Sequence, residues 1–175
     1  MDLTPAAKRA FHIQSYGPSP SIEGVQVVEL KRFADDGGSM TELARLTDGQ
    51  AQAFAGFTVR QVNYSEVEPG AIKAFHLHQR QTDIWYVPPS DRMLVVLLDV
   101  RAGSKTEGTR MRLTLGAGGS RMVRIPPGVA HGCRALERTH LLYITSNVYD
   151  PDDEGRIPHD DPAIGYDWTA GPAIK

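Results

Sequence analysis

Two segments of the chain place histidines at spacings that suit proton transfer or metal binding. His76 and His78 lie two residues apart within the run from Gly70 to Asp83, and His131 follows in Ile125-Pro-Pro-Gly-Val-Ala-His-Gly-Cys133. Side chains two residues apart on a strand project from the same face, and the Pro-Pro-Gly before His131 predicts a turn that delivers a third imidazole. Because imidazole titrates near neutrality and also ligates metals, the residues alone leave both kinds of chemistry open.

The metal-binding interpretation also includes one carboxylate. The spacing Gly70-x5-His76-x-His78-x4-Asp83 resembles the first metal motif of cupins, which usually ends in Glu, and His131 corresponds to the second motif. Two or three imidazoles with one carboxylate suit Fe(II), Mn, Ni or Zn. Under this alternative the ligands are His76, His78, Asp83 and His131, and the cofactor is a divalent transition metal.

The elements that must position these side chains are short strands. Eight runs rich in β-branched and aromatic residues alternate with Gly, Pro and Asp turn signals. These runs are Val25 to Leu30, Phe57 to Tyr64, Ala71 to His78, Ile84 to Val87, Met93 to Val100, Met111 to Leu115, Met122 to Ile125 and Leu141 to Val148. They predict an all-β fold, either a closed barrel or a double-sheet jelly roll. Pro5 to Gln14 predicts a short N-terminal helix capped by Thr4, and Asp150 to Pro162 predicts an ordered loop.

Length and composition exclude several classes of protein. The 175 residues predict one domain spanning 1–175, large enough to bury a core without staples. Lys and Arg number 19 against 21 Asp and Glu, with no basic run, so nucleic-acid binding is not expected. The single cysteine, Cys133, and the lack of an apolar leader predict a cytoplasmic location. The longest apolar run, Met93 to Leu98, is far shorter than the roughly 20 residues of a membrane span.

Further blocks surround the histidines, and their number, order and spacing carry a family resemblance. They are Phe33 to Glu42, Gln61 to Ser65, Ile72 to His76, Asp99 to Gly108, Ile125 to Gly132, Leu142-Tyr143, Tyr149 to Gly155 and Asp160 to Trp168. From about Phe33 to Trp168 the chain resembles the deoxythymidine-diphosphate (dTDP) 4-dehydrorhamnose 3,5-epimerase family of sugar-nucleotide enzymes.

The resemblance implies a fold, an activity and a set of site residues. It implies a homodimeric, cupin-type double-sheet jelly roll that isomerises a nucleotide-linked 4-keto-6-deoxyhexose without a metal or other cofactor. A histidine base removes the protons at C3 and C5, which the C4 ketone acidifies. By position His76 is the base, and Tyr143 is the acid that returns a proton from the opposite face. The residues implied to line the nucleotide-sugar site are Gln61, Asn63, Lys73 and His131.

Four features differ from the family pattern. Gly37 and Lys73 stand where the family has substrate-binding arginines, and Asp83 aligns with the lysine that stabilises the enolate. The C-terminal segment that supplies the carboxylate orienting the base has no match, so His76 is expected to need another partner. Three hypotheses follow: an active epimerase in which Lys73 supplies the missing cation, a metal-dependent cupin enzyme, and a non-catalytic protein that binds a sugar nucleotide.

Several other residues are expected to be structural. Asp99 and Arg101 are predicted to form an ion pair at a strand end, and Cys133 to be a small buried side chain. The histidines without motif support are predicted to lie at the surface or in packing contacts. They are His12, His140 and His159.

Overall fold

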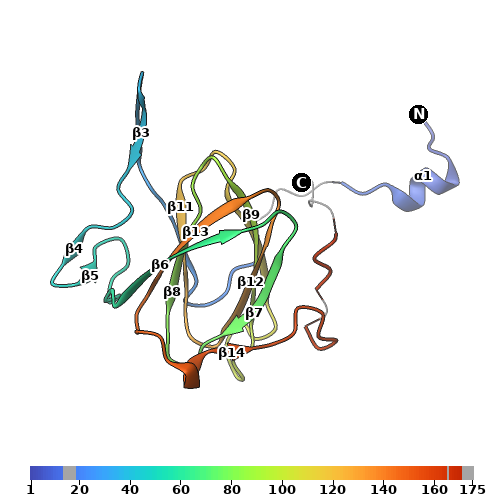
Figure 1. Cartoon of the computed structure of the whole chain (residues 1–175). Coiled ribbons are helices and arrows are strands. Elements are labelled where there is room, and N and C mark those ends of the chain that lie inside the picture. The colour runs from blue at the N-terminus through green and yellow to red at the C-terminus, as the bar shows by residue number, and fades with distance from the viewer. Residues whose placement is uncertain (14–18, 165, 171–175) are drawn as a thin grey trace.

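The computed structural model describes residues 1–13, 19–164 and 166–170, and most of its regular structure is antiparallel β-sheet. The first five-stranded sheet has the order β1 (Gln26–Glu29), β11 (Arg121–Ile125), β8 (Asp83–Tyr86), β13 (Thr139–Thr145) and β6 (Gln61–Val67). The second has the order β10 (Arg110–Gly116), β9 (Arg92–Asp99), β12 (Val129–Ala135), β7 (Ile72–Leu77) and β14 (Gly155–Arg156). Figure 1 shows the two sheets facing each other. The predicted all-β, double-sheet architecture is confirmed.

Two small hairpins connect β1 to β6. They consist of β2 (Arg32–Asp35) with β3 (Gly38–Thr41), and of β4 (Leu46–Thr47) with β5 (Gln50–Ala51). The first hairpin projects away from the sheets (Figure 1) and leaves the side chains of Phe33 and Met40 exposed. The segment after β5 packs Phe54 and Phe57 against the outer face of the first sheet. The strand predicted over Phe57 to Tyr64 therefore begins only at Gln61.

Strand β9 shows how the sequence specifies the layers. Its residues alternate between the two faces of the sheet, and nearly all of them are buried. Met93, Val95 and Leu97 pack in the core between the sheets. Their neighbours Leu94, Val96 and Leu98 pack on the outer face, in a cluster that the C-terminal segment completes with Trp168. The C-terminal segment thus covers the second sheet.

Two strands of the second sheet were not among the predicted runs, and both carry site residues. The turn predicted at Pro126-Pro-Gly128 is present, but His131 does not lie on it, since β12 begins at Val129 and His131 is its third residue. The Asp150 to Pro162 tail is not only loop. It contains a 3₁₀ turn, η1 (Pro151–Asp153), followed by β14, which pairs with β7.

The N-terminal helix is shorter than predicted. α1 (Pro5–Ala10) begins after Thr4, whose Oγ1 accepts a hydrogen bond from the Ala7 amide at 3.3 Å. Phe11 is extended, and the predicted end at Gln14 lies outside the described residues. The helix buries no residue, so packing does not extend it. In the described part of the chain, no helix is long and apolar enough to cross a membrane.

Candidate active site

The three histidines singled out by their spacing meet between the two sheets, on the inner face of the second. His76 lies on β7 directly opposite His131 on β12, and the ring centres of the two are 5.9 Å apart. His78 follows the last residue of β7, and its ring centre is 5.6 Å from that of His131. Because β7 and β12 are adjacent, the strand pairing itself brings together residues that are more than fifty positions apart in sequence.

A cavity of about 470 Å³ opens beside these rings. This volume lies in the range of small-molecule sites. Its walls come from β6, β7, β8, β12, β13 and the tail. The lining residues used below are His76, His78, Asp83, His131, Tyr143 and Arg156. The sheets therefore enclose a pocket in which ionisable groups from five segments converge.

His76 is held between two charged side chains of the tail. Its Nδ1 lies 3.3 Å from Oε1 of Glu154, and its Nε2 accepts a hydrogen bond from Nη1 of Arg156 at 3.1 Å. Since guanidinium can only donate, Nδ1 carries the ring proton and points it at the carboxylate. Burial, followed by His131 and Arg156, lowers the pKa of His76 to about 3. The ring is therefore neutral near pH 7, and its Nε2 can accept a proton when Arg156 moves away.

The short strand β14 creates this arrangement. Gly155 pairs with Leu77, and Arg156 pairs with His76. A Cβ at Gly155 would lie 2.5 Å from the Leu77 carbonyl oxygen, closer than real Cβ contacts allow. Glycine is therefore required for the tail to approach β7, and its two neighbours then reach the His76 ring.

Tyr143 lies on β13 in the opposite sheet and also lines the cavity. Burial, followed by the carboxylates of Asp83 and Glu154, raises the pKa of Tyr143. The phenol consequently stays protonated at neutral pH and is a proton donor. A neutral base on one sheet and a protonated acid on the other are the two groups that a proton transfer across a substrate needs.

The remaining residues implied to contact substrate divide between this cavity and a smaller one. Lys73 and His131 line the main cavity, whereas Gln61 and Asn63 line an adjoining space of about 50 Å³ that shares Tyr143. The Gln61 amide nitrogen donates to Oδ1 of Asn63 at 2.7 Å, and the buried side-chain nitrogen of Asn63 has no hydrogen-bond partner in the described part of the chain. Lys73 is exposed and donates to Ser65 at 3.3 Å.

Glu154, Arg156, Gln81 and Trp85 also line the main cavity, but sequence reasoning assigned none of them to the site. Glu154 supplies the partner that His76 was expected to need. In the sequence, Glu154 stood out only as part of the Tyr149 to Gly155 block. No neighbouring residue indicated that it would contact His76, which lies 78 positions earlier. Trp85 is a buried core residue whose ring meets His131 edge-on at 5.2 Å.

The predicted structural residues are found in structural roles. Asp99 is fully buried and holds Arg101 through Oδ1 at 2.8 Å from Nε, as predicted. Cys133 is buried in the cavity wall, and burial raises the pKa of its thiol to about 11, so it is not a reactive thiolate. His140 pairs with Asp91 at 2.7 Å, away from the cavity.

Comparison with known proteins places this geometry in a family. A family model described as dTDP-4-dehydrorhamnose 3,5-epimerase matches residues 19–175. The spore coat polysaccharide biosynthesis protein SpsL of Bacillus subtilis is 41% identical over 152 residues, covering 85% of this chain and 97% of that protein.

Solved structures agree with this match. A dTDP sugar isomerase from Desulfovibrio desulfuricans superimposes with a TM-score of 0.77 at 30% identity, over 89% of this chain and 98% of that one. An epimerase from Legionella pneumophila, in complex with dTDP-4-keto-L-rhamnose, gives a TM-score of 0.75 at 25% identity, over 88% and 83% of the two chains. The cupin-like jelly roll is thereby confirmed, and the chain belongs to the dTDP-4-dehydrorhamnose 3,5-epimerase family.

Proposed function

We propose that this protein is a sugar-nucleotide epimerase that acts on a nucleotide-linked 4-keto-6-deoxyhexose. The observation that carries the proposal is the position of His76 in the cavity wall, with the Glu154 carboxylate 3.3 Å from its Nδ1. Carbon acids next to a ketone need a base of this kind, and the family of this chain performs such an isomerisation.

His76 removes a proton from C3 or C5 of the sugar. The C–H bond breaks, its electron pair becomes part of an enolate on the C4 ketone, and the proton moves to Nε2. The ring is then an imidazolium whose Nδ1 proton faces Glu154, so the carboxylate stabilises the charge as it forms. Tyr143 donates its phenolic proton to the opposite face of the same carbon, which inverts the configuration. The reaction has no net redox change, so it needs no redox cofactor.

Arg156 must leave Nε2 before the base can meet the substrate. Its side chain is 61% exposed, and moving it breaks its hydrogen bond to His76 and its ion pair with Glu154, both at 3.1 Å. Lys73 also lines the cavity, and two exposed cations there suit the diphosphate of a nucleotide sugar. We assign Lys73 and Arg156 to the diphosphate, Gln61 and Asn63 to the smaller adjoining space, and His131 to the sugar end.

Exposed apolar side chains support the homodimer that the resemblance implies. The edge strand β6 leaves Val62 and Tyr64 about 60% exposed, and the β2–β3 hairpin exposes Phe33 and Met40. An uncovered edge strand with apolar side chains favours association. We propose that a second copy covers these surfaces. The cytoplasmic location stays a prediction.

Product analysis tests the function. The protein is incubated with dTDP-4-keto-6-deoxyglucose, and proton NMR follows inversion at C3 and C5. The wild type is expected to form the epimer, and Tyr143→Phe is expected to lose inversion. Tyr86→Phe is the matched control, because Tyr86 is a buried tyrosine whose hydroxyl contacts Ser120 rather than the cavity. Calorimetric binding without any epimer would instead identify a non-catalytic binding protein.

A further inference from the structure

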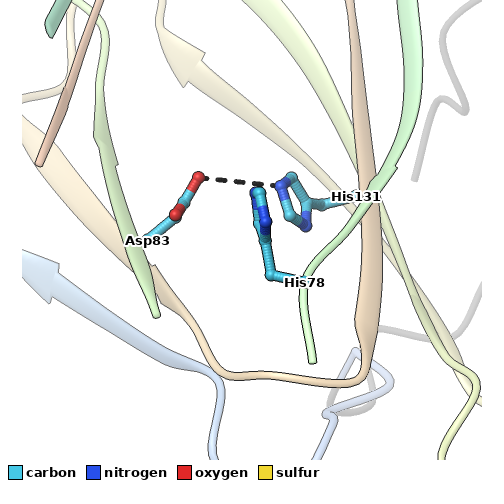
Figure 2. Close-up of side chains that lie close together, drawn as sticks. All are labelled: His78, Asp83 and His131. Carbon is cyan, nitrogen blue, oxygen red and sulfur yellow. Dashed lines mark ion pairs between the residues drawn. The ribbon is translucent and has the colours of Figure 1, made fainter. Parts of the chain in front are cut away.

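Three electron-rich side chains converge at the inner end of the cavity. The ligand atoms of His78, Asp83 and His131 all lie within 4.8 Å of one another, and the three residues are 5%, 4% and 3% exposed. Figure 2 shows them pointing toward one another from separate segments of the fold. Charged and polar groups this deeply buried need partners.

The hydrogen bonds of the two imidazoles decide which nitrogen faces the centre. Nδ1 of His78 donates to the Asp153 carbonyl at 2.6 Å, and Nδ1 of His131 donates to the Val129 carbonyl at 2.9 Å. A carbonyl oxygen only accepts, so each Nδ1 carries a proton, and it is Nε2 of each ring that faces the centre. Metal-binding histidines are typically held in this way, with the other nitrogen donating to a backbone carbonyl.

Asp83 is held in the same manner. Its Oδ1 accepts from the Gln81 amide at 2.8 Å, and its Oδ2 accepts from the Trp85 indole at 3.2 Å. The second oxygen also faces Nε2 of His131 at 3.7 Å, too far for a hydrogen bond, and this buried Nε2 has no hydrogen-bond partner among the residues that the structure describes. Nε2 of His78 has only a long contact, 3.4 Å, to the Gln81 amide. The Gln81 amide thus lies between Asp83 and His78, whereas Nε2 of His131 faces the cluster with no donor among the described residues.

We propose that His78, Asp83 and His131 bind a divalent transition-metal cation. Two imidazole nitrogens and one carboxylate oxygen are a common donor set for such ions. With bonds of about 2.1 Å, tetrahedral ligands lie about 3.4 Å apart, so the 3.7 Å between Asp83 and His131 needs little closure. Three protein ligands leave coordination positions open to the cavity.

His76 is not part of this set, although the four-residue alternative from the sequence included it. Its Nδ1 faces Glu154 and its Nε2 accepts from Arg156, and His76 is not in the group of residues whose ligand atoms lie within 4.8 Å of one another. The base and the cation site are thus separate groups in one cavity.

The cation has a place in the proposed reaction. Asp83 aligns with a lysine in the family resemblance, and a cation held by Asp83 would supply positive charge near the enolate that His76 generates. This role rests on the proposed function, whereas the binding of the cation does not. His131 would then reach the sugar through the cation.

Calorimetric titration of untagged, chelator-treated protein with Zn²⁺ tests the site without any sugar. One ion per wild-type chain is expected, and Asp83→Asn and His131→Gln are each expected to weaken Kd at least about tenfold. His159→Gln is the matched control, because His159 is half exposed and lies outside the cavity. Unchanged affinity in both cluster variants, or no binding by the wild type, would overturn the proposal in favour of a proton shared by His131 and Asp83.

A measurement on the wild type guards against variants that do not fold. Added Co²⁺ is expected to shift the ring protons of His78 and His131 strongly in the NMR spectrum while leaving those of His159 in place. Equal effects on all histidines would contradict the site. Because neither measurement uses turnover, a protein that binds metal but fails to epimerise refutes only the proposed function.

Discussion

Replacing Glu154 by glutamine tests how the base is positioned. The carboxylate lies 3.3 Å from Nδ1 of His76, and the two side chains are 27% and 22% exposed. When His76 takes a proton, a full charge pair forms at this distance, worth about 5 kcal/mol at an effective dielectric of 20. Partial exposure reduces this to about 2–3 kcal/mol, the range of a hydrogen bond to a charged group.

The amide keeps the shape and the accepting oxygen but removes the charge. We therefore expect kcat of Glu154→Gln to fall about 30- to 150-fold, with a smaller change in KM, because the loss occurs mainly after the proton has moved. Asp152→Asn removes a nearby exposed charge of the same tail and is the control. Steady-state NMR assays at several substrate concentrations separate kcat from KM. A kcat within twofold of the wild type, or a change confined to KM, would refute the positioning role.

Other predictions concern the scaffold. Asp99→Asn should lose about 3–5 kcal/mol of stability at pH 7, measured by urea unfolding. Asp99 is buried and accepts hydrogen bonds from Arg101 and from the hydroxyls of Ser104 and Thr106. Hydrogen bonding to Arg101 lowers the pKa of Asp99, so the wild type has its full stability advantage over Asp99→Asn above about pH 4. The difference in unfolding free energy should narrow as the pH falls further, and a difference that stays constant would contradict this. Gly155→Ala should displace β14 and lower kcat about tenfold. Gly37→Ala, where the turn has room for a Cβ, should leave kcat unchanged. Light scattering should give twice the 19.2 kDa of one chain, and a monomer would refute the dimer.

The sequence predicted the strands whose composition is distinctive. β9 is a continuous apolar run because both of its faces are buried, and such runs are recognisable without a partner strand. β12 was missed because small residues interrupt it. Gly132 is needed there, since a Cβ would lie 2.3 Å from that of Ala74 on β7. The close approach of two backbones, rather than strand propensity, determines that segment.

The site residues likewise fall into those that the sequence indicated and those that only the structure shows. The shared face of His76 and His78 followed from strand periodicity, and the motif around His131 indicated that it joins them. Glu154 and Arg156 could not be found in this way, because a two-residue strand exists only through its pairing with β7. The separation of His76 from the other acceptors likewise depends on that pairing. The sequence shows that a histidine, a carboxylate and an arginine are present. Only the pairing of β14 with β7 shows that Glu154 and Arg156 contact His76.

Proton exchange at the sugar tests the central claim, that His76 is the base, most directly. dTDP-4-keto-6-deoxyglucose is incubated with the protein in deuterium oxide, and the C3 and C5 proton signals are followed by NMR. The wild type is predicted to wash out at least one signal, and His76→Asn to slow that loss by about 10²- to 10⁴-fold while still binding the nucleotide. Exchange at the wild-type rate in His76→Asn would contradict the assignment.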